Sequence, residues 1–302
     1  MSHQDASVKS IVFALTANFG IAVTKTVAAI LTGSGAMLAE SIHSFADCGN
    51  QGLLFLGLSA SKKKADIEHP LGHGKSIYFW SFIVALMLFS MGGLFSIYEG
   101  VHKLSSSEEL KSPMIAIVVL SVSILLEGAS LFGCIKQINK LRHNESLWSW
   151  VKNTRQSELV VVLGEDIAAL FGLAFALLSV ILSVVTGNPV YDAIGSIGIG
   201  VLLVIVSFFL ATKVKSLLIG QSADEETRTA IKQMLEARPE VEHVYSLITL
   251  QLGAQIMVAV KAKMAKADSA EQLIENINTC ELALRKAHTN VQWIFFEPDN
   301  KD

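Results

Sequence analysis

Long apolar runs alternate with short polar clusters along the first two thirds of the chain. A helix needs about 20 apolar residues to cross the roughly 30 Å hydrocarbon core of a bilayer. The runs predict spanning helices near residues 10–32, 37–59, 77–101, 113–136, 158–186 and 190–213. We therefore expect a six-helix transmembrane bundle over residues 1–216. The glycine-rich segments ANFG, in the first span, and GSIGIG, in the sixth, favour close helix packing.

The last third of the chain has the pattern of a water-soluble domain. ADEETRTAIKQMLEA has the spacing of an amphipathic helix that ends before Pro239. SAEQLIENINTCELALRKAH predicts a second amphipathic helix, which begins after Ser269. VEHVYSLITLQL and QIMVAVKAK predict two strands that turn at Gly253, and VQWIFFE predicts a third. We expect a small α+β domain of order αββαβ over residues 217–302. Such a small sheet leaves one face uncovered, so we also expect a homodimer.

Composition supports a membrane protein. The chain is 51% hydrophobic and 17% charged, whereas a soluble protein carries about 25% charged residues. The C-terminal region has more Asp and Glu than Lys and Arg, which argues against nucleic acid as a partner. The three cysteines are far apart, so their spacing indicates neither a disulfide framework nor a CxxC metal site.

Basic residues at the ends of the predicted spans indicate the orientation, because cytoplasmic loops carry an excess of Lys and Arg. Only Lys103 and Lys111 fall on one side of the membrane. The other side receives Lys9, Lys62, Lys63, Lys64, Lys75, Lys136, Lys140, Arg142, Lys152, Arg155, Lys213 and Lys215. We therefore expect both termini and the C-terminal domain in the cytoplasm. We place this multi-pass protein in a bacterial inner membrane.

A polar stripe interrupts the second predicted span. In AESIHSFADCGNQ, Glu40, His43, Asp47 and Asn50 follow the spacing of one helix face. A charged side chain at the centre of a bilayer costs at least about 2.5–3.5 kcal/mol. His and Asp one turn apart can hold a divalent ion through an imidazole nitrogen and a carboxylate oxygen. The alternative is that the stripe only hydrogen-bonds neighbouring helices.

Three further acids lie in other predicted spans. Glu165 and Asp166 are adjacent in LVVVLGEDIAALFG. Adjacent helical residues point about 100° apart, so we expect only one of these two to face a given site directly. Glu127, in SILLEGASLFG, is either an additional ligand or the partner of the buried Lys25.

The loop after the second span contains a third candidate group. In KKKADIEHPLGHGKSIYFW, Asp66, His69 and His73 are spaced for a loop-borne metal site, and Gly72 and Gly74 permit a tight turn. Histidines in loops are usually only solvated. An ion-binding pair in the neighbouring helix makes the metal interpretation stronger.

Together these motifs resemble one known family. HSFAD, HPLGHGK, an acidic fifth span and an αββαβ tail resemble the cation diffusion facilitator family, and LGEDIAALFG and TGNPVYDAIGSIGIG resemble its zinc transporter 9-like branch. The resemblance covers nearly the whole chain. It implies a homodimeric six-helix transporter, not an enzyme, that moves zinc or a similar divalent ion out of the cytoplasm in exchange for protons.

The resemblance also implies ligand sets. His43, Asp47 and Asp166 match the transport site, and the loop site is matched by Asp66, His69 and His73. The family carries a histidine or aspartate four residues before the fifth-span acid, where this chain has Val162. Either Glu165 fills that place, or water or Glu127 does; Glu40 is a further intramembrane acid.

The tail matches the family's metal cluster only weakly. His243 and Glu297 fall at matching positions, and Phe295 stands where a ligand is expected.

Two other function classes fit parts of the pattern. An intramembrane metalloenzyme would use the metal to activate water, but the chain has no HExxH motif. A membrane metal sensor would need a metal-rich tail. Imidazole with carboxylates suits zinc and also Fe(II), Mn(II) and Co(II). Metal flux into proteoliposomes separates these classes.

Overall fold

The structure is a computed structural model. It describes residues 3–106, 111–142 and 145–301, with the backbone alone for residues 3–17 and 106. The chain divides into two compact units. The first, the helical unit, comprises Met1–Leu56, Trp80–Asn144 and Glu158–Lys213. The second, the sheet unit, comprises Gly57–Phe79, Glu145–Ser157 and Val214–Asp302. The sheet unit thus includes two segments outside the predicted domain of residues 217–302, and the first of them contains the adjoining ends of the second and third predicted spans.

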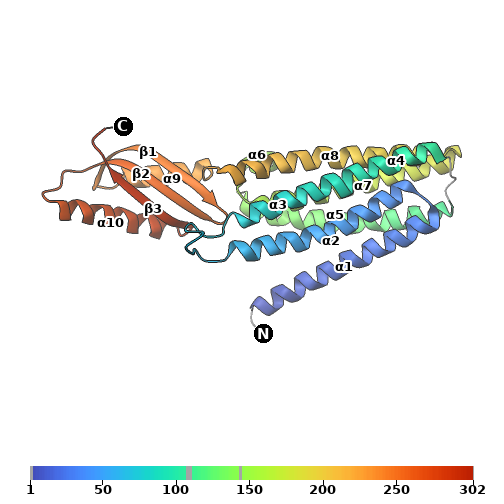
Figure 1. The fold of residues 1–302 in the computed structure, drawn as a ribbon, viewed down its shortest axis with the longest axis horizontal. Helices are drawn as coiled ribbons and strands as arrows, with labels where there is room; N and C mark the ends of the chain where they lie inside the picture. Colours follow the sequence, from blue (N-terminus) through green and yellow to red (C-terminus); the bar gives the residue numbers. More distant parts are fainter. Residues whose placement is uncertain (1–2, 107–110, 143–144, 302) are drawn as a thin grey trace. The chain divides into compact units, whose positions relative to one another are not determined.

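Every predicted span coincides with helical structure (Figure 1). The elements are α1 (His3–Thr32), α2 (Gly35–Ser61), α3 (Ser76–Met87), the π-helical segment η1 (Leu88–Leu94), α4 (Phe95–Ser106), α5 (Pro113–Leu141), α7 (Ser157–Thr186) and α8 (Val190–Ile219). Within the described residues, four helices are long and apolar enough to cross a membrane: Ser76–Ser105, Pro113–Leu141, Ser157–Thr186 and Val190–Ile219. The described apolar part of α1, Asn18–Thr32, is shorter, and the polar stripe lowers the mean hydropathy of α2.

Glycines bring α8 against η1 and α4 at backbone contact distance. A Cβ atom added to Gly200 would lie 2.6 Å from the carbonyl oxygen of Gly93, and one added to Gly100 would lie 2.7 Å from that of Ala193. Any side chain at these positions would separate the helices. The expectation of close packing is confirmed for GSIGIG. At Gly20 of ANFG, an added Cβ has no described atom within 4 Å.

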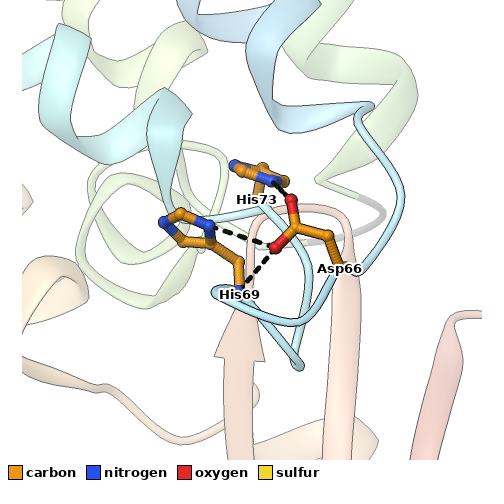
Figure 2. A group of neighbouring side chains, drawn as sticks. All are labelled: Asp66, His69 and His73. Carbon is orange, nitrogen blue, oxygen red and sulfur yellow. Dashed lines mark hydrogen bonds and ion pairs between the residues drawn. The ribbon is translucent and has the colours of Figure 1, made fainter.

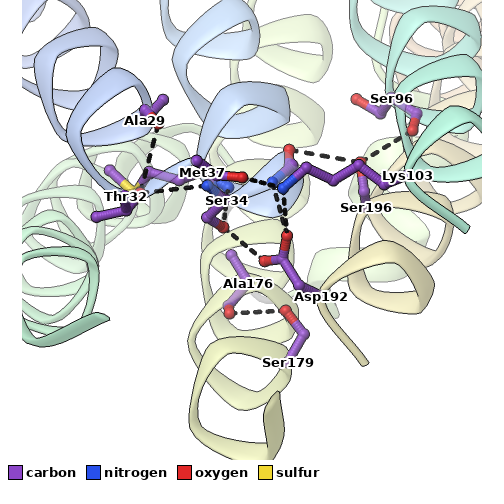
Figure 3. A network of polar contacts seen from close by, with 12 residues as sticks. Ala29, Thr32, Ser34, Met37, Ser96, Lys103, Ala176, Ser179, Asp192 and Ser196 are labelled. Atoms are coloured by element: carbon purple, nitrogen blue, oxygen red, sulfur yellow. Dashed lines mark hydrogen bonds and ion pairs between the residues drawn. The ribbon is translucent and has the colours of Figure 1, made fainter. Parts of the chain in front are cut away.

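A buried polar network joins the α1–α2 turn to α4 and α8 (Figure 3). The Asp192 side chain accepts hydrogen bonds from Ser34 Oγ at 2.5 Å and from the Gly35 backbone N–H at 2.6 Å. Lys103 Nζ lies 3.1 Å from the same carboxylate and also donates to the carbonyl oxygen of Gly33. Asp192 is 1% exposed, so its charge is compensated inside the protein.

The sheet unit has the predicted order αββαβ. Its C-terminal elements are α9 (Glu225–Glu236), β1 (Val241–Leu252), β2 (Gln255–Met264), α10 (Ala270–Ala287) and β3 (Val291–Pro298). The unit also contains a short helix that was not predicted, α6 (Leu147–Asn153), before α7. The strand order is β1-β2-β3, with β1 antiparallel and β3 parallel to β2. The predicted turn lies at Gly253, whose φ is 67°. Ser269 caps α10 by accepting a hydrogen bond from the N–H of Gln272.

Both amphipathic helices of this unit cover the sheet. Ile231 and Leu235 of α9, with Cys280 and Leu284 of α10, are fully buried. They pack with alternating strand residues: Val244, Ile256, Val258, Val260, Ala262 and Val291. The parallel pairing of β2 and β3 needs a crossover connection, which α10 provides.

Candidate metal sites

A cavity of about 210 Å³ lies among α1, α2, α5 and α7. Four carboxylates line it: Asp47, Glu127, Glu165 and Asp166. The other lining residues are Asn18, Ile21, Ser44, Gln51, Leu126, Ser130, Val162 and Ala169. Since all four acids come from apolar helices, the field inside this cavity favours a cation.

Both adjacent acids of α7 line the same cavity; which of them faces an ion directly stays a prediction. α7 is α-helical from Ser157 to Thr186, and no local distortion brings Glu165 and Asp166 together. Neighbouring helical side chains point about 100° apart, and the cavity is wide enough for both to line it. Val162 also lines it, so the position that is apolar in this chain faces the same space.

Hydrogen bonds orient the two acids toward different helices. Asn50 Nδ2 of α2 donates to Glu165 Oε1 at 2.6 Å, and Ser130 Oγ of α5 donates to Asp166 Oδ1 at 3.3 Å. The sequence pattern placed Asn50 on the polar stripe without a role, and it did not identify Ser130. Each lies three residues after an acid, Asp47 or Glu127, and helix spacing was the available signal.

His43 lies beside the cavity without lining it. Its Nε2 is 3.6 Å from Asp47 Oδ2, and the side chain is 1% exposed. Neither ring nitrogen has a hydrogen-bond partner among the described residues. The same holds for Asp47 Oδ1 and Asp166 Oδ2. Buried polar atoms without partners are rare in folded proteins, and a bound ion would satisfy them.

Glu40 belongs to a different contact. Lys25 Nζ lies 3.2 Å from Glu40 Oε2 and donates to Ser44 Oγ at 2.7 Å. Lys25 and Glu40 are both fully buried. The partner of Lys25 is therefore Glu40 and not Glu127, which leaves Glu127 as a cavity acid.

The three predicted loop residues form a compact cluster (Figure 2). His73 Nε2 lies 3.0 Å from Asp66 Oδ2, and His69 Nδ1 lies 3.3 Å from Asp66 Oδ1. Each residue offers one ligand atom, and these atoms lie within 4.8 Å of one another. Within the described parts of the chain, no other group of three or more His, Cys, Asp or Glu residues converges in this way. The candidate ligands in the apolar helices are thus farther apart than those of the loop.

Electrostatics in the loop favour the ionised carboxylate. The hydrogen bond with the His73 side chain, and then the bond from the His69 backbone N–H, lower the pKa of Asp66 to about 2. An ionised carboxylate beside two imidazoles is a ligand set that zinc prefers.

The C-terminal sheet supports this loop, since both belong to the sheet unit. Tyr78 Oη accepts a hydrogen bond from the backbone N–H of Gly253 at 3.0 Å. A side chain at Gly74 would overlap the Leu252 carbonyl group. Gly72 has a φ of 72°, which only glycine adopts readily. The φ of Gly72 agrees with the predicted turn, whereas Gly74 is required by its close contact with the Leu252 carbonyl group.

The weak tail positions are not brought together. His243 lies on β1 and Glu297 on β3, with β2 between these strands. His243 Nδ1 instead lies 4.0 Å from Glu236 Oε1. Among the described residues, the group that could hold a metal ion includes neither His243 nor Glu297.

Comparisons with known proteins give the family and its relatives. Residues 11–219 match the cation efflux transmembrane domain. The chain is 37% identical over 234 residues to the human "Proton-coupled zinc antiporter SLC30A9, mitochondrial", which covers 76% of this chain and 41% of that protein. It is 35% identical over 249 residues to metal tolerance protein C4 of Arabidopsis thaliana, covering 82% and 54%. It is 27% identical over 253 residues to magnetosome protein MamB of Magnetospirillum gryphiswaldense, covering 83% and 80%. The chain thus spans about half, or less, of the length of the human and plant relatives.

Proposed function

Since the chain belongs to the cation efflux family, we propose that it moves a divalent metal ion, zinc first among the candidates, across a membrane in exchange for protons. The observation that carries this proposal is the cavity with four carboxylates beside the buried His43, whose ring nitrogens have no hydrogen-bond partner among the described residues. Such a group of acids among apolar helices is costly unless a cation compensates it. The human relative is named a proton-coupled zinc antiporter.

The ion is held by His43 and Asp47 of α2 and by Asp166 of α7. One imidazole nitrogen and two carboxylate oxygens suit zinc, and they suit Fe(II), Mn(II) or Co(II) when geometry or supply favours those ions. With a neutral imidazole, the two carboxylates balance the charge of a divalent ion. The loop cluster of Asp66, His69 and His73 holds a second ion.

Exchange with protons follows from competition for one site. Metal binding requires deprotonated ligands, so an entering ion displaces protons and an entering proton weakens the metal's hold. The metal-loaded and the protonated forms both change the side to which the cavity opens. Glycine-mediated packing of α8 against η1 and α4 provides the close helix surfaces along which such a change occurs.

The proposed architecture has six spans over residues 1–216 and a cytoplasmic domain over residues 217–302. Helices at all six predicted positions support it, as does the strong bias of basic residues to one side. The exposure of Ile248 and Phe295, 60% and 56%, supports a homodimer that covers the sheet. The membrane is a bacterial inner membrane in this proposal, and the bias of basic residues supports a cytoplasmic position of both termini.

Zinc uptake by proteoliposomes under an imposed pH gradient tests the function. Asp47→Asn removes one ligand charge at constant shape, and we expect its uptake to fall to the level of protein-free vesicles. Asp66→Asn is the matched control, because it removes a carboxylate from the loop and leaves the cavity intact; we expect partial transport. Ordinary transport by Asp47→Asn would refute the site. A wild-type protein that moves no metal would refute the function.

A further inference from the structure

Glu165 is a buried carboxylate whose surroundings do not balance its charge. It is 7% exposed, and its hydrogen-bond partner is the neutral amide of Asn50, which is fully buried. The charged groups that act most strongly on it are two other carboxylates, Asp47 and Asp166. Burying a carboxylate costs several kcal/mol unless a positive charge accompanies it. A bound cation offsets that cost, and a proton offsets it when no ion is bound.

The Glu165 carboxylate lies at the contact between α2 and α7. Its bond to Asn50 turns Glu165 toward α2, the helix that also carries His43 and Asp47. The bond from Ser130 holds the adjacent Asp166 on the side of α5. An ion gripped by the two α2 ligands would therefore meet the Glu165 carboxylate on the facing wall. Val162, one turn earlier on this wall, is apolar and donates nothing.

A second observation points to a ligand in the same place. Both nitrogens of the His43 imidazole are buried and without hydrogen-bond partners among the described residues, and Nε2 faces Asp47, which lines the cavity. Asn50 also keeps a buried, unpaired Oδ1. Its amide nitrogen is committed to Glu165, and so its contribution is to fix the direction of that carboxylate.

We propose that Glu165 is the fourth protein ligand of the transported ion, beside His43, Asp47 and Asp166, and that Asn50 is its positioning residue. This inference rests on the proposed function. The resulting set has one nitrogen and carboxylates from both helices. It is richer in oxygen than a set with two histidines, and it therefore discriminates less strongly between zinc and Mn(II).

The test combines zinc binding by calorimetry in detergent with zinc and manganese uptake by proteoliposomes, both on the full chain. Glu165→Gln can still accept the Asn50 bond, so the fold is retained. Losing a ligand costs more than losing an outer-shell partner, which weakens metal binding about 10–100-fold. We expect Glu165→Gln to raise the zinc Kd by more than about 100-fold. The double variant Glu165→Gln/Val162→Glu places a carboxylate at position 162 instead of 165. It should recover much of the zinc affinity, because residue 162 lines the same cavity.

Asn50→Ala tests the positioning role. We expect it to raise the zinc Kd and the transport KM about 10–100-fold, with a smaller effect on the maximal rate. Asn276→Ala, which removes an amide that accepts a hydrogen bond from Gln272 on the exposed surface of α10, is the matched control and should leave Kd and KM unchanged. If Asn50→Ala lowers the unfolding temperature but leaves Kd and KM unchanged, the positioning role is refuted.

The remaining outcomes separate this inference from the function on which it rests. If the wild type carries zinc and Glu165→Gln binds and carries it within threefold of wild type, Glu165 is not a ligand, while the transport proposal stands. If Val162→Glu fails to rescue Glu165→Gln although the double variant unfolds at the same temperature as wild type, the shared-wall geometry is refuted. If the wild type carries no divalent ion, the function itself falls.

Discussion

Replacing Asp192 by alanine should lower the free energy of unfolding of the helical unit by more than a typical substitution of an exposed residue does. Its carboxylate accepts from Ser34 Oγ, from the Gly35 N–H and from Lys103 Nζ, at 2.5, 2.6 and 3.1 Å. Breaking a buried ion pair by removing one partner costs about 3–5 kcal/mol. Lys103 keeps the Gly33 carbonyl as an acceptor, and its side chain is 13% exposed. We therefore expect a loss of about 3 kcal/mol, at the lower end of that range.

The assay is denaturant-induced unfolding of the purified protein in detergent, with tryptophan fluorescence as the signal. Asp192→Asn keeps one acceptor oxygen and the side-chain shape, so its loss should be smaller. Combining it with Lys103→Met removes both charges, and the double variant should lose less than the sum of the two single variants. A free energy of unfolding for Asp192→Ala within about 0.5 kcal/mol of wild type, as at indifferent surface sites, would contradict the assigned role of this network.

Three further changes test the helix packing and the loop. Gly200→Ala should destabilise the protein and slow transport, because the new Cβ would lie 2.6 Å from a backbone oxygen. Gly198→Ala should be harmless in the same unfolding and uptake assays, because its Cβ would meet no described atom of another helix within 4 Å. His73→Ala should abolish zinc binding by the loop, measured by calorimetry, and leave partial transport; loss of the cavity's affinity as well would count against two independent sites. The pKa of Asp66 is lowered from 3.8 to about 2. The stabilisation that its ionised carboxylate gives to the loop is therefore complete above about pH 4 and is lost as the pH falls through about 2. A carbon-13 titration of Asp66 with a midpoint near 4 would contradict this.

Much of the fold was predictable because its signals are local. An apolar run long enough for a bilayer becomes a helix wherever it lies in the chain, so the six predicted spans coincide with helices. Turn and cap residues act over three or four positions, which is why Gly253 and Ser269 marked real boundaries. The loop cluster of Asp66, His69 and His73 was visible for the same reason, since one short segment supplies all its atoms.

The intramembrane site needed the tertiary structure, because its residues come from helices far apart in the sequence. Periodicity shows which face of α2 is polar, but it does not say what that face meets. In the packed bundle Lys25 forms an ion pair with Glu40, and Glu127 lines the cavity. It also opened a space wide enough for both acids of α7, and it set Asn50 against Glu165. These contacts depend on how the helices are rotated and how closely they approach one another. The packing of the whole bundle determines that rotation, and the sequence of a single helix does not.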